Sequence, residues 1–359
     1  MKIAILGLSI TSSWGNGHAT TYRGLVRELV KRGHDVLFLE RDAPWYASNR
    51  DLPKPPYGRT VLYSSLQDLK RNYGADVRAS DLAIVGSFVP EGVAVGEWVI
   101  ATARGIPAFY DIDTPVTMSK LEHGDFEYLA PNLVPRYRLY LSFTGGPLLE
   151  RIETRHGSPM ARALYCSVDP DVYYPEPAPK RWDLGYVGTY SDDRQPFLEC
   201  LLLEPARRWP EGRFVVAGPL YPDSIVWPPN VERIDHLPPS EHRAFYNGQR
   251  FTLNLTRAEM KTAGYSPSVR LFEAAACAAP IVSDYWRGLE TIFEIGSEAL
   301  TANCPEEILR ILRETGPEEA SALGSQARAR VLAHHTAAHR AAELESYCQQ
   351  AVTNCTTAG

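Results

Sequence analysis

The sequence predicts an α/β protein made of two doubly wound, parallel-sheet domains. Short apolar runs alternate with helical patterns along the first half, and the same alternation resumes after a proline-rich stretch. The first apolar run, Lys2–Leu6, is almost continuous, as expected for a strand buried on both faces of a parallel sheet. A chain of 359 residues is too long for one typical domain and suits two.

The first half begins with a strand, a polar loop and a helix. The helix is expected over Thr20–Arg32, because its apolar residues form one stripe and Gly33 ends the pattern. Further apolar runs predict the remaining strands of this half, at 35–40, 82–86, 107–110, 139–143 and 162–165.

The second half repeats this organisation after Tyr174–Pro179, which is rich in proline and reads as a linker. We expect a first domain over 1–172, a second over 173–335, and a C-terminal helix over 336–359 that packs back on the first domain and ends in a tail. Two such domains are expected to face a central cleft. Strands of the second domain are predicted at 184–187, 213–217, 231–234, 251–255 and 280–283, with a helical tail over 320–350.

Composition excludes several classes of protein. The formal net charge is −6, which argues against a nucleic-acid partner. No apolar run is long enough to span a membrane, so no membrane span is expected. The cysteines form no CxxC pair and no zinc spacing, which favours a reducing, cytoplasmic location; they lie at positions 166, 200, 277, 304, 348 and 355.

The most informative stretch runs from Gly264 to Asp284 and reads as a loop, a helix, a turn and a buried strand. Ser266 or Ser268 can cap the helix, whose free amides and dipole form a site for an anion such as a diphosphate. Glu273 lies about one turn further in, where a carboxylate could accept hydrogen bonds from a ribose. Diphosphate beside ribose describes a nucleotide or a nucleotide-sugar.

Cations precede this helix. Arg257 and Lys261 lie between the preceding strand and the glycine turn, close to the expected anion site. At the start of the second domain, Gly188 and Arg194 occupy the first loop after a strand, where Arg194 could contact a phosphate. The alternative is an ordinary capped helix packed on a sheet, and the cations favour the nucleotide site.

The loop after the first strand contains Gly15-Asn-Gly17-His18. Gly17 lets the backbone approach a ligand, and His18 could serve as a base or as a partner for a sugar hydroxyl. A helix-capping loop is the alternative. A dinucleotide fingerprint fits poorly, because the glycines come well after the strand and Thr20 replaces the third glycine.

Asp111 and Asp113 follow another strand and are placed at a ligand-binding edge. Because Pro115 makes a regular extended backbone doubtful, we expect hydroxyl binding or catalysis here and no metal site. Capping of the loop is the alternative. An acidic cluster nearby lacks metal-site spacing and reads as surface; it comprises Glu122, His123, Asp125 and Glu127.

These motifs together resemble the GT-B glycosyltransferases, and in particular their CgeB-like (spore-maturation-type) group. The resemblance rests on Gly17-His-Ala-Thr-Thr-Tyr-Arg-Gly-Leu25, on Ser266-Pro-Ser-Val-Arg-Leu-Phe-Glu-Ala-Ala-Ala-Cys277 and on Ser167-Val-Asp-Pro-Asp-Val-Tyr-Tyr-Pro175. It implies two Rossmann-like domains, with the acceptor in the first and a sugar nucleotide in the second. It also implies that Glu273 contacts the ribose and that Arg257 and Lys261 contact the diphosphate, usually without a metal.

One departure concerns the E-x7-E pattern of many retaining relatives. The earlier glutamate is replaced here by Tyr265, which we place near the acceptor or donor sugar. Inversion would need a base such as His18 or an aspartate, whereas in retention the leaving diphosphate itself could assist. The sequence leaves both outcomes open.

The sequence as a whole predicts a metal-independent glycosyltransferase with no cofactor, in which a nucleotide-sugar, by preference a UDP-sugar, is a co-substrate. The partners expected are this donor and a small-molecule or glycan acceptor. The alternatives are a GT-B-type sugar-nucleotide epimerase, which would turn over the donor without an acceptor, and a non-catalytic scaffold that binds a glycan or a partner. The sequence does not fix the oligomeric state.

Overall fold

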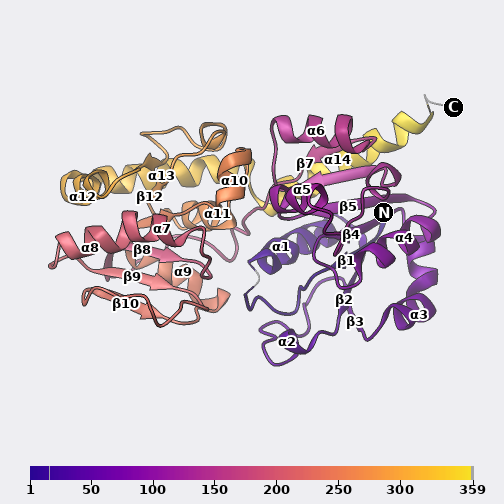
Figure 1. Cartoon of the computed structure of the whole chain (residues 1–359), viewed down its shortest axis with the longest axis horizontal. Coiled ribbons are helices and arrows are strands. Elements are labelled where there is room, and N and C mark those ends of the chain that lie inside the picture. The colour runs from indigo at the N-terminus through magenta and orange to yellow at the C-terminus, as the bar shows by residue number, and fades with distance from the viewer. Residues whose placement is uncertain (16, 357–359) are drawn as a thin grey trace. The chain divides into compact units, whose positions relative to one another are not determined.

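The computed structural model describes residues 1–15 and 17–356, and the chain divides into two compact units (Figure 1). The first unit contains Met1–Cys166 together with the last helix, α14 (Ala337–Thr356). The second contains Ser167–Thr336. Both are α/β units with one parallel sheet each, as the alternation of apolar runs predicted.

The first unit is built on a seven-stranded sheet in the order β3-β2-β1-β4-β5-β6-β7, with every neighbouring pair parallel. The order reverses between β1 and β4, which is where doubly wound sheets bind ligands. The strands are β1 (Lys2–Gly7), β2 (Asp35–Arg41), β3 (Arg59–Tyr63), β4 (Leu82–Gly86), β5 (Ile106–Asp111), β6 (Leu139–Ser142) and β7 (Ala161–Ala163).

Helices connect these strands, and Figure 1 shows them around the sheet, with α14 in yellow. The connecting helices are α1 (His18–Lys31), α2 (Pro44–Ala47), α3 (Leu66–Ala79), α4 (Gly92–Thr102), α5 (Thr114–Glu122) and α6 (Pro147–His156), with a 3-10 turn at Val134–Arg136.

The second unit has a six-stranded sheet in the order β10-β9-β8-β11-β12-β13, again parallel throughout. Its strands are β8 (Trp182–Val187), β9 (Phe214–Ala217), β10 (Val231–Ile234), β11 (Gln249–Asn254), β12 (Ile281–Ser283) and β13 (Leu300–Thr301). Its helices are α7 (Gln195–Leu198), a π-turn (Glu199–Leu203), α8 (Glu204–Arg208), α9 (Pro239–Asn247), α10 (Ala258–Ala263), α11 (Val269–Ala276), a 3-10 turn (Leu289–Thr291), α12 (Pro305–Glu314) and α13 (Pro317–His334).

Two strands were missed, and both lie at a sheet edge. Strand β3 is mostly accessible to solvent, and β13 has only two residues, so neither produces the continuous apolar run of a central strand. The predicted helical tail is two helices, because α13 ends at His334 and α14 begins at Ala337. The break coincides with the change of unit between Thr336 and Ala337.

The proline-rich stretch Tyr174–Pro179 does not link the two units. The Glu176 amide donates to Asn247 Oδ1 at 3.0 Å, and Asn247 Nδ2 donates to the Tyr174 carbonyl at 3.1 Å. These bonds fix the stretch to the end of α9 within the second unit. The chain changes unit earlier, between Cys166 and Ser167.

The last helix completes the first unit by packing against α1 and the strands β5 and β6. Its buried residues recur on one face, which explains the docking; they are Ala337, Arg340, Ala341, Leu344, Cys348 and Ala351. At the C-terminal end of α1, the Glu345 carboxylate accepts a hydrogen bond from Arg32 Nη2 at 2.5 Å. The same carboxylate lies 2.6 Å from His34 Nε2. The hydrogen bond from Arg32, aided by His34, holds the pKa of the Glu345 carboxyl down at about 2, against the opposing effect of burial.

We expect Glu345→Gln to weaken the docking of α14. A carboxyl with a depressed pKa in the folded state stabilises the fold above its unfolded pKa, and this stability is lost as the pH falls from about 4.5 to about 2. The variant should lose about 1 kcal/mol of the free energy of unfolding at neutral pH, since the pair is near the surface. Its stability should also depend less on pH in the acid range. Urea unfolding at pH 7, 4 and 3 measures this; a parallel loss at all three pH values would contradict it.

Candidate functional site

The second unit places several polar side chains at the carboxyl edge of its sheet. The strand order reverses at β8, which has β9 on one side and β11 on the other. In doubly wound sheets this switch point is where ligands bind. The segments that leave β8 and β11 at this edge contain the residues predicted to bind the donor.

Asn254, the last residue of β11, forms hydrogen bonds with several side chains at this edge. Its Oδ1 accepts from Ser268 Oγ and from Arg270 Nη1, each at 2.8 Å, and its Nδ2 donates to Ser283 Oγ at 2.9 Å. Because Asn254 is buried, these bonds tie the start of α11 to the ends of β11 and β12.

The start of α11 differs from the prediction. The helix begins at Val269, so Pro267 lies before it, and Ser268 occupies the cap position without capping through its side chain. The Ser268 hydroxyl is directed to Asn254, and Ser266 Oγ lies 3.2 Å from Met260 Sδ. Both serines therefore anchor the loop, and the helix start has no side-chain cap that would compete with an anion.

Lys261 projects from α10 toward Asp284, which follows β12. Its Nζ lies 3.3 Å from Asp284 Oδ2 and 4.5 Å from the centre of the Phe197 ring. Asp284 is buried and also accepts from Thr256 Oγ1 at 2.9 Å. Burial raises the pKa of the Asp284 carboxyl, and the neighbouring Lys261 opposes that rise.

The two predicted arginines lie on separate segments at the same edge. Arg257 precedes α10, and its Nε lies 3.9 Å from Asp193 Oδ2. Arg194 is held by the loop after β8, where its Nη2 donates to the Thr189 carbonyl at 2.6 Å and its Nε to Ser191 Oγ at 2.8 Å.

Glu273 lies within α11 with only 4% of its side chain exposed. Its Oε2 accepts from the Tyr246 hydroxyl at 3.1 Å and lies 3.5 Å from His242 Nδ1. The carboxylate is thus part of a buried polar cluster between α11 and α9. That Glu273 accepts hydrogen bonds from the ribose of the donor stays a prediction.

Tyr265, at the position of the missing glutamate, has a left-handed backbone with φ of 50°. Its amide donates to the Arg287 carbonyl at 2.7 Å, and its ring lies so close to Gly288 that a Cβ there would be 2.6 Å from the ring. The loop before α11 is therefore held in an unfavourable conformation by its neighbours.

Sequence reasoning missed Arg270. Only 7% of this residue is exposed, and its Nε donates to the Val187 carbonyl at 2.6 Å at the end of β8. Its guanidinium lies 4.7 Å from the centre of the Tyr186 ring. The available signal was a charged residue inside the apolar run Val269-Arg-Leu-Phe272.

Gly188 lies directly against this arginine. A Cβ at Gly188 would lie 2.5 Å from the Tyr186 hydroxyl and 2.9 Å from Arg270 Nη2. A side chain at this position would therefore displace the Tyr186 hydroxyl and the Arg270 guanidinium, which favours glycine as the first residue after β8.

In the first unit, the structure brings His18 and Asp113 together. His18 starts α1 directly after Gly17, and Asp113 precedes α5. The His18 Nε2 lies 3.9 Å from Asp113 Oδ2, and the His18 ring packs edge-on against Phe143 with the centres 5.5 Å apart. Both side chains are partly exposed, at 27% and 18%. Asn16 of the same loop lies outside the described residues.

Asp111 does not reach the ligand edge, contrary to expectation. It is fully buried, accepts from Thr117 Oγ1 at 2.7 Å and also accepts from the Tyr140 hydroxyl. Burial raises the pKa of the Asp111 carboxyl to about 6, against the opposing effect of these two hydrogen bonds. Asp111 is therefore an internal residue, and the role of Asp113 in acceptor binding or catalysis stays a prediction.

The acidic cluster near α5 is a surface ion-pair group, in which Lys120 Nζ contacts Asp125 at 2.6 Å and Glu127 at 2.9 Å. Across residues 1–15 and 17–356, no group of three His, Cys, Asp or Glu side chains could hold a metal ion. The expectation that no metal or cofactor is needed stays a prediction. None of the described helices is long and apolar enough to cross a membrane.

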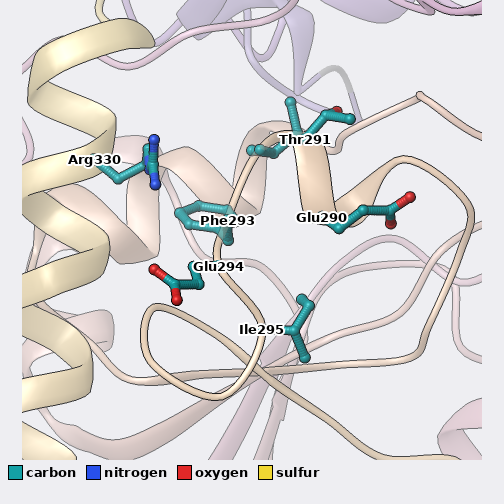
Figure 2. Close-up of a pocket in the computed structure, with 7 residues that line it drawn as sticks. Glu290, Thr291, Phe293, Glu294, Ile295 and Arg330 are labelled. Carbon is teal, nitrogen blue, oxygen red and sulfur yellow. The ribbon is translucent and has the colours of Figure 1, made fainter.

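Figure 2 shows a pocket of about 360 Å³ in the second unit, beside α13. It is lined by Glu290, Thr291, Ile292, Phe293, Glu294, Ile295 and Arg330, and none of the predicted site residues is among them. Two of its charged residues already have partners, since Arg330 Nε lies 2.9 Å from Glu298 Oε2 and both oxygens of Glu290 accept from the Gly288 amide. We therefore leave this pocket out of the donor site.

The chain is similar to known proteins in part of its sequence and in its fold. Residues 194–346, which include the whole switch-point cluster from Arg257 to Asp284, match a family described as glycosyl transferase-like. No curated protein matches the chain in sequence.

Similar solved structures cover almost the whole chain. Sucrose-phosphate synthase from Thermosynechococcus elongatus is 15% identical, with a TM-score of 0.71 over 99% of this chain and 100% of that one. HepE of Anabaena, in complex with UDP and glucose, is 12% identical, with a TM-score of 0.71 over 98% and 100%. An alpha-glucosyltransferase in complex with UDP is 13% identical, with a TM-score of 0.71 over 97% and 100%.

At these identities the structural likeness shows the fold, which is the GT-B fold of glycosyltransferases. The family match over the second unit assigns the activity class. The chain is a glycosyltransferase, as the sequence predicted.

We expect Asp111→Asn to leave the protein folded and to change its stability profile. Because the pKa of Asp111 is higher in the folded state than its ordinary 3.8, the folded state binds this proton more tightly. Stability should therefore fall as the pH rises from about 4 to about 6, by up to about 3 kcal/mol.

The amide should remove this decline, whereas the exposed control Asp125→Asn should keep it. Thermal unfolding between pH 4 and pH 7 measures both. An unchanged slope in Asp111→Asn, or unfolding far below the parent at pH 7, would count against a buried carboxyl that titrates near pH 6.

Proposed function

We propose that this glycosyltransferase transfers a sugar from a UDP-sugar, bound by the second unit, to a hydroxyl of an acceptor bound by the first unit. The observation that carries the donor assignment is the convergence of Lys261, Arg257 and the start of α11 on one sheet edge at the switch point. The preference for UDP is supported by the fold neighbours, whose structures contain UDP.

The reaction needs little covalent chemistry from the protein. The acceptor oxygen forms a bond to the anomeric carbon, and the bond between that carbon and the diphosphate oxygen breaks with its electron pair going to the diphosphate. Lys261, Arg257 and the α11 dipole stabilise the growing negative charge, a role that a metal ion fills in other enzymes.

The proton released by the acceptor hydroxyl passes to His18. The short distance from His18 Nε2 to Asp113 Oδ2 supports this assignment, because a carboxylate beside an imidazole favours its protonated form. Asp113 then serves as the partner of the imidazolium, as in catalytic pairs in which a second group orients the base.

Three finer assignments belong to this proposal. The chain is placed in the CgeB-like group on its Ser266–Cys277 motif. A cytoplasmic location is supported by the free thiols of the described part of the chain, at Cys166, Cys200, Cys277, Cys304 and Cys348. The acceptor is a small molecule or glycan with a free hydroxyl, and no metal is required.

A nucleotide panel tests the donor assignment directly. UDP should raise the melting temperature more than GDP, dTDP or CDP, because a ligand that binds only the folded state stabilises it. Mass spectrometry after reaction with candidate acceptors should then show that the mass of the acceptor increases by that of one sugar residue. Donor turnover without any acceptor would indicate an epimerase, and no nucleotide binding at all would overturn the proposal.

Lys261→Met should weaken UDP binding at least about tenfold, since a charged contact to phosphate is lost, while uridine binding should change little. Lys261→Arg should retain most of the affinity. The matched control is Lys180→Met, because Lys180 Nζ donates to the Asn247 carbonyl in the same unit, before β8. Calorimetric titration measures all three variants, and equal UDP affinity in Lys261→Met would remove this residue from the site.

His18→Ala should lower kcat by about 10² to 10⁴, the usual contribution of a general base, with donor affinity unchanged. Asp113→Asn should lower kcat less, since the imidazole remains. His123→Ala is the control, because His123 lies on the surface of the same unit and bonds to the Ser119 carbonyl. A turnover rate equal to the parent in His18→Ala would exclude it as the base.

A further inference from the structure

We propose that Arg270 is the positioning residue of the diphosphate site: its buried guanidinium joins the carboxyl ends of β8 and β11 and fixes the loop after β8 in a conformation that receives phosphate. This inference rests on the proposed function and adds to it a residue that the sequence motifs did not single out. Arg270 acts through the loop and does not itself contact the donor.

The first argument is the place of the guanidinium. Its Nε donates to the Val187 carbonyl at 2.6 Å, at the end of β8, and its Nη1 donates to Asn254 Oδ1 at 2.8 Å, at the end of β11. These two strands are neighbours at the switch point. One side chain therefore links the two strand ends between which a ligand would lie.

The second argument is charge. All hydrogen-bond acceptors of Arg270 are neutral: two backbone carbonyls and one side-chain amide, with Leu255 as the weaker carbonyl at 3.5 Å. Within the described residues, no carboxylate lies at ion-pair distance from Arg270. A buried cation without a counterion is costly, and it becomes favourable where an anion binds nearby.

The third argument is the loop after β8, whose successive carbonyls are all held by side chains. Arg270 donates to the Val187 carbonyl, and Arg194 donates to the Thr189 carbonyl. Between them, the Tyr221 hydroxyl donates to the Gly188 carbonyl at 3.2 Å. Gly218 after β9 adds close packing, since a Cβ there would lie 2.0 Å from the Gly188 carbonyl oxygen.

The backbone amides of this loop differ in whether they have an acceptor within the protein. Those of Gly188 and Tyr190 donate to the carbonyls of Ala217 and Pro219. In the described part of the chain, the Thr189 amide, on a partly exposed residue, has no protein acceptor. A backbone donor beside a cation is suited to a phosphate oxygen.

The alternative is that Arg270 only stabilises the fold, like a structural strut, and has no effect on phosphate binding. The two roles differ in what they do to phosphate recognition. A strut would lower the melting temperature and affect every ligand equally. A positioning residue would weaken UDP much more than uridine, which lacks the phosphates.

The experiment compares the parent with Arg270→Met and Arg270→Lys by titration of UDP and of uridine, well below each melting temperature. The matched control is Arg250→Met. Arg250 also lies on β11 and is partly buried, but at the opposite end, where it contacts Asp183 at 2.9 Å and the Leu312 carbonyl at 3.2 Å.

We expect Arg270→Met to lose at least about tenfold in UDP affinity with uridine nearly unchanged, and Arg270→Lys to fall between it and the parent, because the charge stays while the two-pronged contact is lost. Arg250→Met should lower the melting temperature with UDP affinity retained. Arg270→Lys provides the readout if the methionine variant does not fold.

Three results would overturn the inference: equal losses for UDP and uridine, UDP affinity in Arg270→Lys equal to the parent, or a UDP loss in Arg250→Met as large as in Arg270→Met. If the parent itself binds no nucleotide, the proposed function fails. If the parent binds UDP and the Arg270 variants do so equally well, only the present inference fails.

Discussion

The proposed donor site depends on how the ends of β8 and β11 are joined. At the switch point of a doubly wound sheet the two central strands are followed by different connections, so their last polar groups need partners other than each other. Arg270 supplies these partners, because it donates to the Asn254 side-chain oxygen at 2.8 Å and to the Val187 carbonyl at 2.6 Å. The same pair fixes Ser268, and thus the start of α11. The loop after β8, the helix start and the strand ends therefore form one rigid element.

The partly exposed cations at this sheet edge are arranged differently from the buried Arg270. Lys261 and Arg257 each face an aspartate, Asp284 and Asp193, at 3.3 Å and 3.9 Å. A weakly paired cation can exchange its carboxylate for a phosphate at little cost, and the carboxylate keeps it oriented in the meantime. Burial of Asp284 raises the pKa of its carboxyl, so that this partner gives up its charge more readily than a surface aspartate would.

The sequence was sufficient for the fold because central parallel strands produce continuous apolar runs, and it failed where this signal is weak, at the edge strands β3 and β13. It placed Lys261, Arg257 and Glu273 in one region, since all three lie within one strand–loop–helix segment. It could not give the contacts. No sequence motif marked Arg270, and only the tertiary structure shows its guanidinium against Val187, from a strand 83 positions earlier. The polar clusters of Glu273 and of Asp284 have the same origin in distant parts of the chain.

The two aspartates after β5 show why local spacing has this limit. Residues two apart share a face only while the backbone remains extended. Here Asp113 has φ of −140° and ψ of 54°, which departs from strand geometry, so Asp111 turns into the core while Asp113 turns to His18. The two carboxylates still interact, because the charge on Asp113 contributes to the raised pKa of Asp111. Spacing along the chain therefore predicts that both carboxylates follow the same strand, and the backbone turn at Asp113 decides that Asp111 is the buried one.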